Sequence, residues 1–365
     1  MPKVLMYYSH GNKIGGPLTY INTVIESPLK EKYEFVTCYQ NQAPGGWDGK
    51  MLKRMVEQIK QEKPDIVHVH GAQSEGFYGV LAAKKAGCKH VVMTVHGFAF
   101  DDSACKGMKH FLYKHIVEPF SLRHAEQVYC VCKFAADRKI VKKNCKKRLY
   151  GYIHNPVPQL CITEDRQSVR TRLGITEQDT VFAISGRLVY DKGFSVLADA
   201  VKIANRSTDV PFKLLVIGDG VYRNTFSQLM QEEIDAGQVI LVGHTNRVAD
   251  YLNAADAYVF PSFHENLSIA ILEACASRLP CIVSNVGGNG EIVTDGENGF
   301  VIDGFAAKDY AEKMRYLLKN KDAMHTMGEN AKRIADTKFS LETMCQKIDE
   351  VYRNALANSQ YKHEN

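Results

Sequence analysis

Short apolar runs alternate with amphipathic segments along the whole chain. In the first half, runs of strand length occur near residues 3–8, 34–39, 65–69, 90–95, 126–132 and 148–153, and segments with helical spacing of apolar residues fill the gaps. In the second half, strand-like runs occur near 180–185, 213–217, 239–243 and 257–260. Strands that alternate with helices are typical of parallel α/β layers, so this order predicts an α/β fold.

Two prolines separate the two series of strands. Asn155-Pro156-Val157-Pro158 cannot continue a helix or a sheet ladder, because proline lacks a backbone donor and favours extended backbone in the residue before it. Since 365 residues is about twice a typical domain, we expect two domains, 1–158 and 159–339. Three helical patterns close the chain, and the last of them, 340–357, is expected to pack through Leu341, Met344, Ile348 and Val351.

Composition narrows the class of protein. Apolar residues make up 45% of the chain, which is enough for packed cores. The sequence contains no run of eighteen apolar residues and no signal-peptide pattern, so we expect a cytoplasmic protein. The ten cysteines are scattered without a C-x-x-C pair, which indicates neither a zinc site nor a redox pair.

Charge is distributed unevenly. Residues 1–160 carry 24 Lys and Arg against 13 Asp and Glu, a net +11, whereas residues 161–365 carry 22 against 28, a net −6. This imbalance suggests an anionic partner for the first half. A dense basic run lies between Lys133 and Arg148 without interleaved aromatic residues, which argues against nucleic acid. The run is either a solvated face of the protein or a surface with which the protein docks on an anionic membrane.

Residues 257–277 predict a strand, a tight loop and a helix. A helix that begins near Ser268 directs free N–H groups and the positive end of its dipole toward the end of the strand, an arrangement suited to phosphate. Glu265 lies in the loop and Glu273 in the helix, and ionised carboxylates accept hydrogen bonds from sugar or ribose hydroxyls. An ordinary crossover with two solvated carboxylates would produce the same pattern.

Charged and glycine-containing turns follow two other strands of the second half. The strand at 180–185 leads into G-R-L-V-Y-D-K-G, in which Arg187 and Lys192 flank the turn. A planar guanidinium and a point charge at the mouth of a helix suit a diphosphate. The next strand ends in Gly218-Asp219-Gly220, a turn that lets a ligand approach the backbone closely.

The first half offers weaker candidates. Gly15 and Gly16 open a helix after the first strand, where they either approach a phosphate or sugar or simply form a turn. The loop lacks the G-x-G-x-x-G pattern, which disfavours dinucleotide binding. Two strands end in His68-Val69-His70 and in His96, and we take His96 as a candidate site residue and His68 as packing.

Together these motifs resemble one family, the retaining GT-B glycosyltransferases of group 1, which use nucleotide-sugar donors. The G-R-L-x-x-x-K-G turn, the I-G-D-G turn, the A-D-x-x-x-x-P-S run and the E-x7-E pair occur in the family's order, and the G-G loop and T-x-H of the first half also fit. The resemblance spans roughly residues 1–340. It implies an α/β fold of two Rossmann-like α/β/α domains facing a cleft, with the acceptor on the first, the donor in the second, and a last helix, about 340–360, that crosses back to the first.

The resemblance also implies roles for individual residues. Arg187 and Lys192 would hold the donor diphosphate, Glu273 would accept from the ribose hydroxyls and Glu265 from the hydroxyls of the donor sugar. Further donor contacts implied by the family fall at Gly15, Gly16, Gly186, Gly218, Asn266, Leu267 and Ser268, and His96 would face the sugar beside the reacting carbon. Where the family often has E-G-F-G, this chain has E-N-L-S, and Ser adopts a positive φ poorly.

The implied activity is the transfer of a sugar to a hydroxyl of a saccharide acceptor, with retention of anomeric configuration, in surface polysaccharide or glycolipid biosynthesis. A lipid-linked acceptor is favoured by the charge of the first half, and a soluble acceptor is the alternative. A UDP-sugar is the favoured donor and a GDP-sugar the next. Neither a metal nor another cofactor is expected, since cationic side chains can stabilise the leaving diphosphate. The enzyme is then expected at the inner face of the cell membrane. The alternatives are a catalytically silent GT-B subunit that binds nucleotide or a partner protein, and a sugar-nucleotide epimerase.

Overall fold

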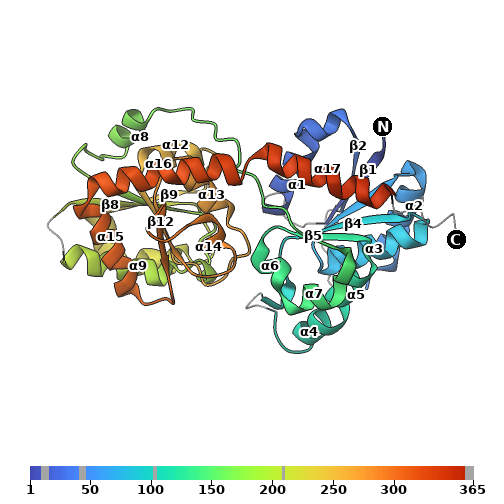
Figure 1. Cartoon of the computed structure of the whole chain (residues 1–365). Coiled ribbons are helices and arrows are strands. Elements are labelled where there is room, and N and C mark those ends of the chain that lie inside the picture. The colour runs from blue at the N-terminus through green and yellow to red at the C-terminus, as the bar shows by residue number, and fades with distance from the viewer. Residues whose placement is uncertain (10–15, 41–46, 102–104, 208–209, 358–365) are drawn as a thin grey trace. The chain divides into compact units, whose positions relative to one another are not determined.

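The computed structural model describes the chain except for residues 10–15, 41–46, 102–104, 208–209 and 358–365, so Gly15 lies outside the described residues. The chain forms two compact units (Figure 1). Unit 1 comprises Met1–Asn155 together with Leu341–Asn365, and unit 2 comprises Pro156–Ser340. Which unit binds donor and which binds acceptor stays a prediction.

Unit 1 contains a six-stranded parallel sheet with the order β2-β1-β3-β4-β5-β6. Its strands are β1 Lys3–Ser9, β2 Glu34–Gln40, β3 Ile66–His70, β4 His90–Val95, β5 Gln127–Cys130 and β6 Leu149–Tyr152. Its helices and single turns are α1 Gly16–Glu26, η1 Pro28–Glu31, α2 Gly49–Glu62, α3 Ser74–Ala86, η2 Ala99–Asp101, α4 Gly107–Leu112, the π-helical η3 Tyr113–Val117, α5 Glu118–His124, α6 Lys133–Asp137, α7 Lys139–Cys145, η4 Lys146–Arg148 and α17 Leu341–Ala357.

Unit 2 contains a second six-stranded parallel sheet, in the order β12-β11-β10-β7-β8-β9. Its strands are β7 Thr180–Ser185, β8 Phe212–Ile217, β9 Val239–Gly243, β10 Ala257–Phe260, β11 Cys281–Ser284 and β12 Gly299–Ile302. Its helices and single turns are α8 Arg166–Arg172, η5 Tyr190–Lys192, α9 Phe194–Arg206, α10 Arg223–Leu229, α11 Gln231–Asp235, α12 Val248–Ala254, α13 Ile269–Ala276, α14 Asn289–Ile292, α15 Ala307–Lys319 and α16 Lys321–Lys338.

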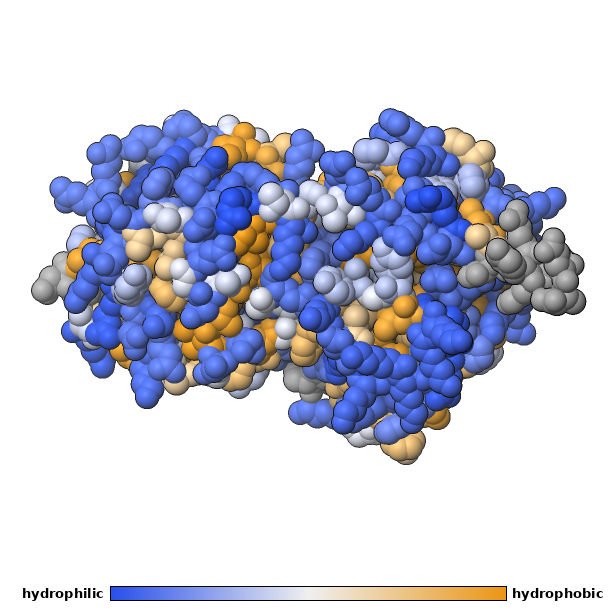
Figure 2. All heavy atoms as spheres, viewed as in Figure 1, coloured by the Kyte–Doolittle hydropathy of each residue, from blue (hydrophilic) through white to orange (hydrophobic). Residues whose placement is uncertain are grey.

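The burial of the central strands explains their continuous apolar sequences. Every residue of β3, β4, β7, β10 and β11 is buried, as expected for a parallel sheet that helices cover on both faces. Hydrophilic side chains cover most of the visible surface of each unit (Figure 2). In this arrangement the strand ends, rather than the sheet faces, are left for ligands.

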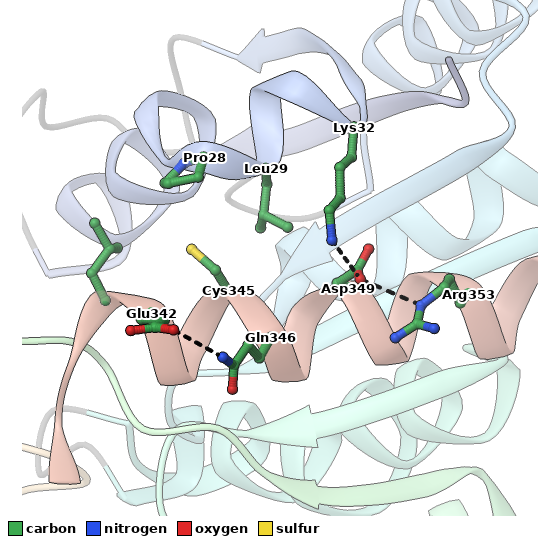
Figure 3. Close-up of a pocket in the computed structure, with 9 residues that line it drawn as sticks. Pro28, Leu29, Lys32, Glu342, Cys345, Gln346, Asp349 and Arg353 are labelled. Atoms are coloured by element: carbon green, nitrogen blue, oxygen red, sulfur yellow. Dashed lines mark hydrogen bonds and ion pairs between the residues drawn. The ribbon is translucent and has the colours of Figure 1, made fainter. Parts of the chain in front are cut away.

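Helix α17 packs on unit 1, mostly as its apolar spacing predicts. Met344, Ile348 and Val351 are buried, but Leu341 is 39% exposed, so its predicted place in the packing stripe is wrong. Leu341 is the first residue of the helix and lines an open pocket of about 530 Å³ between η1 and α17 (Figure 3). At that pocket Asp349 accepts from Lys32 Nζ at 2.9 Å, a contact that anchors the helix.

Candidate functional site

The turns that follow β7 and β10 lie side by side, because these strands are neighbours in the sheet of unit 2. The Phe263 N–H donates to the Asp191 carbonyl at 2.8 Å. At Gly193, the N-cap residue of α9 with φ +72°, an added Cβ would lie 1.8 Å from the Pro261 oxygen. Only glycine therefore allows the two turns to approach this closely.

The predicted diphosphate lysine and the predicted sugar carboxylate contact each other. Lys192 Nζ forms an ion pair with Glu265 Oε1, and the two side chains are 21% and 11% exposed. The Ser262 hydroxyl lies 3.1 Å from the same carboxylate oxygen, and Lys192 Nζ lies 5.3 Å from the centre of the Phe260 ring. An ammonium group has three donors, so Lys192 can hold Glu265 in place and still donate to a bound anion.

Arg187 occupies the same β7 turn and is exposed. Within the described part of the chain, its guanidinium makes no hydrogen bond and no ion pair. Its fork of N–H donors is thus available for a phosphate or carboxylate, the anions whose geometry it matches.

Two glycines shape the β7 and β8 turns, for different reasons. Gly186 has φ +136°, with open space around an added Cβ, so its backbone conformation alone favours glycine. Gly218 has φ +134°, and an added Cβ would lie 1.9 Å from the Gly186 oxygen. The Gly186 N–H donates to Ile217 and the Gly218 N–H to Gly243, each at 2.9 Å. Both glycines shape the edge of the sheet beside Arg187.

The loop from Glu265 to Ser268 is not strained by the absence of glycine. Ser268 caps α13 with φ −77°, and its hydroxyl accepts from the Ile271 N–H at 3.4 Å. The described non-glycine residues with positive φ are Lys63, Lys146 and Arg278, so Asn266 has negative φ as well. The α13 N-terminus is therefore formed where the sequence predicts it, and the E-N-L-S departure requires no unfavourable backbone.

The turn at Gly287 and Gly288 contacts the backbone of this loop. The Gly288 N–H donates to the Asn266 carbonyl at 2.6 Å, and at Gly287, with φ +57°, an added Cβ would lie 1.9 Å from the Glu265 oxygen. Leu267 is buried. Asn266 Oδ1 is also buried, and none of the described residues donates a hydrogen bond to it.

Glu273 differs from Glu265 in its surroundings. It lies in α13, largely buried, and burial raises the pKa of its carboxyl to about 7. No cation or hydrogen-bond donor contacts this carboxyl among the residues that the structure describes. A largely buried carboxyl that has no partner among the described residues is a candidate for a binding site.

The candidates of unit 1 gather around three histidines. His96 follows β4, and its Nε2 lies 3.3 Å from Nδ1 of His70 at the end of β3, with the rings stacked. Tyr20 meets the His96 ring edge-on at 5.2 Å. Burial lowers the pKa of His96 to about 4, so its imidazole is neutral near pH 7. Gly16 is exposed at the start of α1.

His68, which the sequence predicts as a packing residue, is fully buried and hydrogen-bonded. Its Nδ1 lies 2.7 Å from the Tyr352 hydroxyl of α17, and its Nε2 lies 2.7 Å from the Thr94 hydroxyl. His70 is not among the predicted site residues, although the sequence places it at the end of a strand. The pairing of β3 with β4 brings it beside His96. No local sequence pattern predicts the contacts of Ser262, Phe260 and Gly287.

The described residues contain no group of three or more His, Cys, Asp or Glu arranged to hold a metal ion. In the same residues, no helix combines the length and the apolar character needed to cross a bilayer.

Comparison with known proteins agrees with this geometry. Residues 165–334 match the family of glycosyl transferases group 1, and residues 34–155 match the glycosyl transferase 4-like domain. The chain is 31% identical over 327 residues to UDP-Gal:alpha-D-GlcNAc-diphosphoundecaprenol alpha-1,3-galactosyltransferase of Escherichia coli, covering 85% of this chain and 81% of that protein. The two strand-end turns and the matched families thus define a glycosyltransferase.

Solved structures define the fold. Sucrose-phosphate synthase from Thermosynechococcus elongatus superposes with a TM-score of 0.82 at 20% identity, covering 98% of this chain and all of that one. Alr3699/HepE of Anabaena, in complex with UDP, superposes with a TM-score of 0.78 at 18% identity, covering 97% of this chain and all of that one. The chain belongs to the group 1 glycosyltransferases and has the GT-B fold, as the motifs predicted.

Proposed function

We propose that this protein moves a sugar from a UDP-sugar to a hydroxyl of a lipid-linked saccharide, with retention of anomeric configuration, in the biosynthesis of a surface polysaccharide or glycolipid. The name of the Escherichia coli relative gives UDP-Gal as the donor and a diphosphoundecaprenol-linked sugar as the acceptor. The Anabaena structure contains UDP. These two names support the nucleotide and the class of acceptor. A GDP-sugar is the next candidate for the donor.

The observation that carries the proposal is the set of groups at one edge of the unit 2 sheet. Arg187 is exposed and has no partner in the described part of the chain, Lys192 is paired with Glu265, and α13 begins shortly after Glu265 with a capped N-terminus. Arg187, Lys192 and the free N–H groups of the helix would neutralise a diphosphate from more than one side. Glu273, which is largely buried and has no partner among the described residues, would then accept from the ribose hydroxyls.

The reaction needs little more from this unit. The bond between the anomeric carbon and the donor's phosphate oxygen breaks, the bond from that carbon to the acceptor oxygen forms on the same face, and the acceptor proton passes to the released phosphate oxygen. Arg187 and Lys192 would stabilise the charge that develops on the diphosphate. Glu265, held by Lys192 and Ser262, would orient the sugar through its hydroxyls, and no metal is assigned a role.

A direct test is turnover of UDP-sugars and GDP-sugars with a lipid diphosphate saccharide, preceded by thermal-shift measurements with UDP, GDP and ADP, because a ligand that binds the folded state raises its stability. An R187A/K192A variant should lose nucleotide affinity by about tenfold to a hundredfold per charge-assisted contact. K308A, which removes an exposed lysine of α15, is the matched control. Wild-type turnover in the folded double variant would contradict the assignment, and binding without turnover would favour a silent subunit.

A further inference from the structure

One helical stretch of unit 1 carries apolar side chains that the described protein does not cover. No residue of α4 or η3 is buried. Met108, Phe111, Leu112 and Ile116 are 74%, 54%, 41% and 52% exposed. A helix of a globular protein ordinarily buries its apolar side chains, and an exposed cluster of them marks an interaction surface. In Figure 2, hydrophobic atoms lie among hydrophilic ones at the edge of unit 1 where Figure 1 places α4.

The same stretch is basic. Residues 105–117 contain Lys106, Lys109, Lys114 and two histidines, and no Asp or Glu. All three lysines are exposed. A helical segment with large apolar side chains among lysines is typical of helices that lie in a membrane interface, where the lysines meet anionic headgroups. A protein partner would have to supply a matching acidic and apolar groove, whereas an anionic bilayer supplies both properties at once.

The stretch is attached to the loop that carries His96. Glu118, directly after η3, is fully buried, and its Oε1 accepts from the Ala99 N–H at 2.6 Å. The Phe100 ring lies 6.2 Å from the ring of His110 and 5.9 Å from Lys114 Nζ. Residues 96–101 of this loop therefore contact the basic helical stretch and the residue that follows it.

The basic run from Lys133 to Arg148, which the sequence suggested as a membrane contact, is built differently. Arg138 pairs with Asp101 and lies over the Phe98 ring at 4.7 Å, and Arg148 donates to the carbonyl of Ala125 at 2.6 Å. These two arginines are thus engaged in contacts within unit 1. Phe134, 43% exposed, is the one large apolar side chain that the run exposes in the described structure, so its lysines can offer charge but few apolar anchors.

We propose that Lys106–Val117, here called the interfacial segment, is a docking surface for an anionic lipid bilayer. Its apolar side chains would enter the boundary between headgroups and acyl chains, and its lysines would contact the headgroups. This deepens the proposed function and rests on it in one respect: a lipid-linked acceptor held at this surface would lie beside the loop of His96.

Co-sedimentation of the full chain with vesicles tests the surface. Wild type should bind vesicles of phosphatidylglycerol and phosphatidylcholine and should bind pure phosphatidylcholine at least about tenfold more weakly, because lysines near an anionic surface add attraction. F111E/I116E should reduce the partition coefficient at least about tenfold by removing apolar anchors. L229E/Y316E, which changes exposed apolar residues of unit 2, should bind like wild type. K142E/K143E/K146E/K147E should lose less than F111E/I116E.

Several outcomes would overturn the proposal: wild type that stays in the supernatant with anionic vesicles, F111E/I116E that binds like wild type, or a lysine variant that loses more than F111E/I116E. A wild-type dimer that F111E/I116E converts to monomer without loss of vesicle binding would make the surface a protein interface instead. F111S/I116S replaces the glutamate variant if thermal unfolding shows that the latter is misfolded. Vesicle binding that depends on Phe111 and Ile116 without turnover of any nucleotide sugar would support the surface and refute the proposed function.

Discussion

Replacing Glu273 by Gln should stabilise unit 2 at high pH while it weakens nucleotide binding. Burial raises the pKa of this carboxyl from 4.5 to about 7, so the folded state binds more protons than the unfolded state between these values. Stability contributed by this group is therefore present at low pH and is lost as the pH rises through 7. Each pKa unit corresponds to about 1.4 kcal/mol, so ionised Glu273 costs the folded state about 3 kcal/mol at pH 8.

Glutamine has the shape of the protonated side chain and no charge to desolvate. The variant should thus gain up to about 3 kcal/mol at pH 8 and almost nothing at pH 4. For a unit of this size, that gain raises the melting temperature by about 6–12 °C at pH 8. E177Q, which changes an exposed carboxylate of unit 2, should give no gain that grows with pH.

Thermal unfolding at several pH values, with and without UDP, measures both effects. If the ribose hydroxyls donate to ionised Glu273, E273Q should bind UDP about tenfold to a hundredfold more weakly. Wild-type affinity for UDP should also fall as the pH drops below 7. A variant that is less stable than wild type at pH 8 would refute the reasoning, because it would mean that the carboxylate has a favourable partner in the folded protein.

Three further changes test the site and its support. E265Q should leave UDP affinity nearly unchanged and lower only transfer and sugar-nucleotide affinity, which turnover and calorimetry measure separately; if E265Q and E273Q weaken UDP binding equally, the two glutamate roles are wrong. G287A should cost about 2 kcal/mol or more and reduce turnover, since its Cβ meets the Glu265 backbone, whereas G296A, also at positive φ but with open space around its Cβ, should cost about 1 kcal/mol. Y352F should destabilise unit 1 by about 1–3 kcal/mol in urea unfolding, because His68 loses its buried partner; unchanged stability would argue against that hydrogen bond.

The residue pattern alone was sufficient for the α/β class, for ten of the strands and for the turns that carry Arg187, Lys192 and Glu265. Strands buried on both faces are apolar over their whole length, and this property is local. Strands β11 and β12 were not predicted. Each has four residues. β11 pairs with β10 and β12 pairs with β11, and this pairing rather than their own pattern makes them strands.

Tertiary structure decided which of the predicted groups are paired, buried or free. Lys192 and Glu265 are 73 positions apart and meet only because β7 and β10 are neighbours. Distant segments also determine the burial that raises the pKa of Glu273. In the same way they determine the exposure of Phe111, whose helix has no buried residue. The sequence determines the chemical type of each side chain and the periodicity of apolar positions. The partner of a side chain and its exposure to water depend on the packed chain, because residues far apart in the sequence supply the contacts.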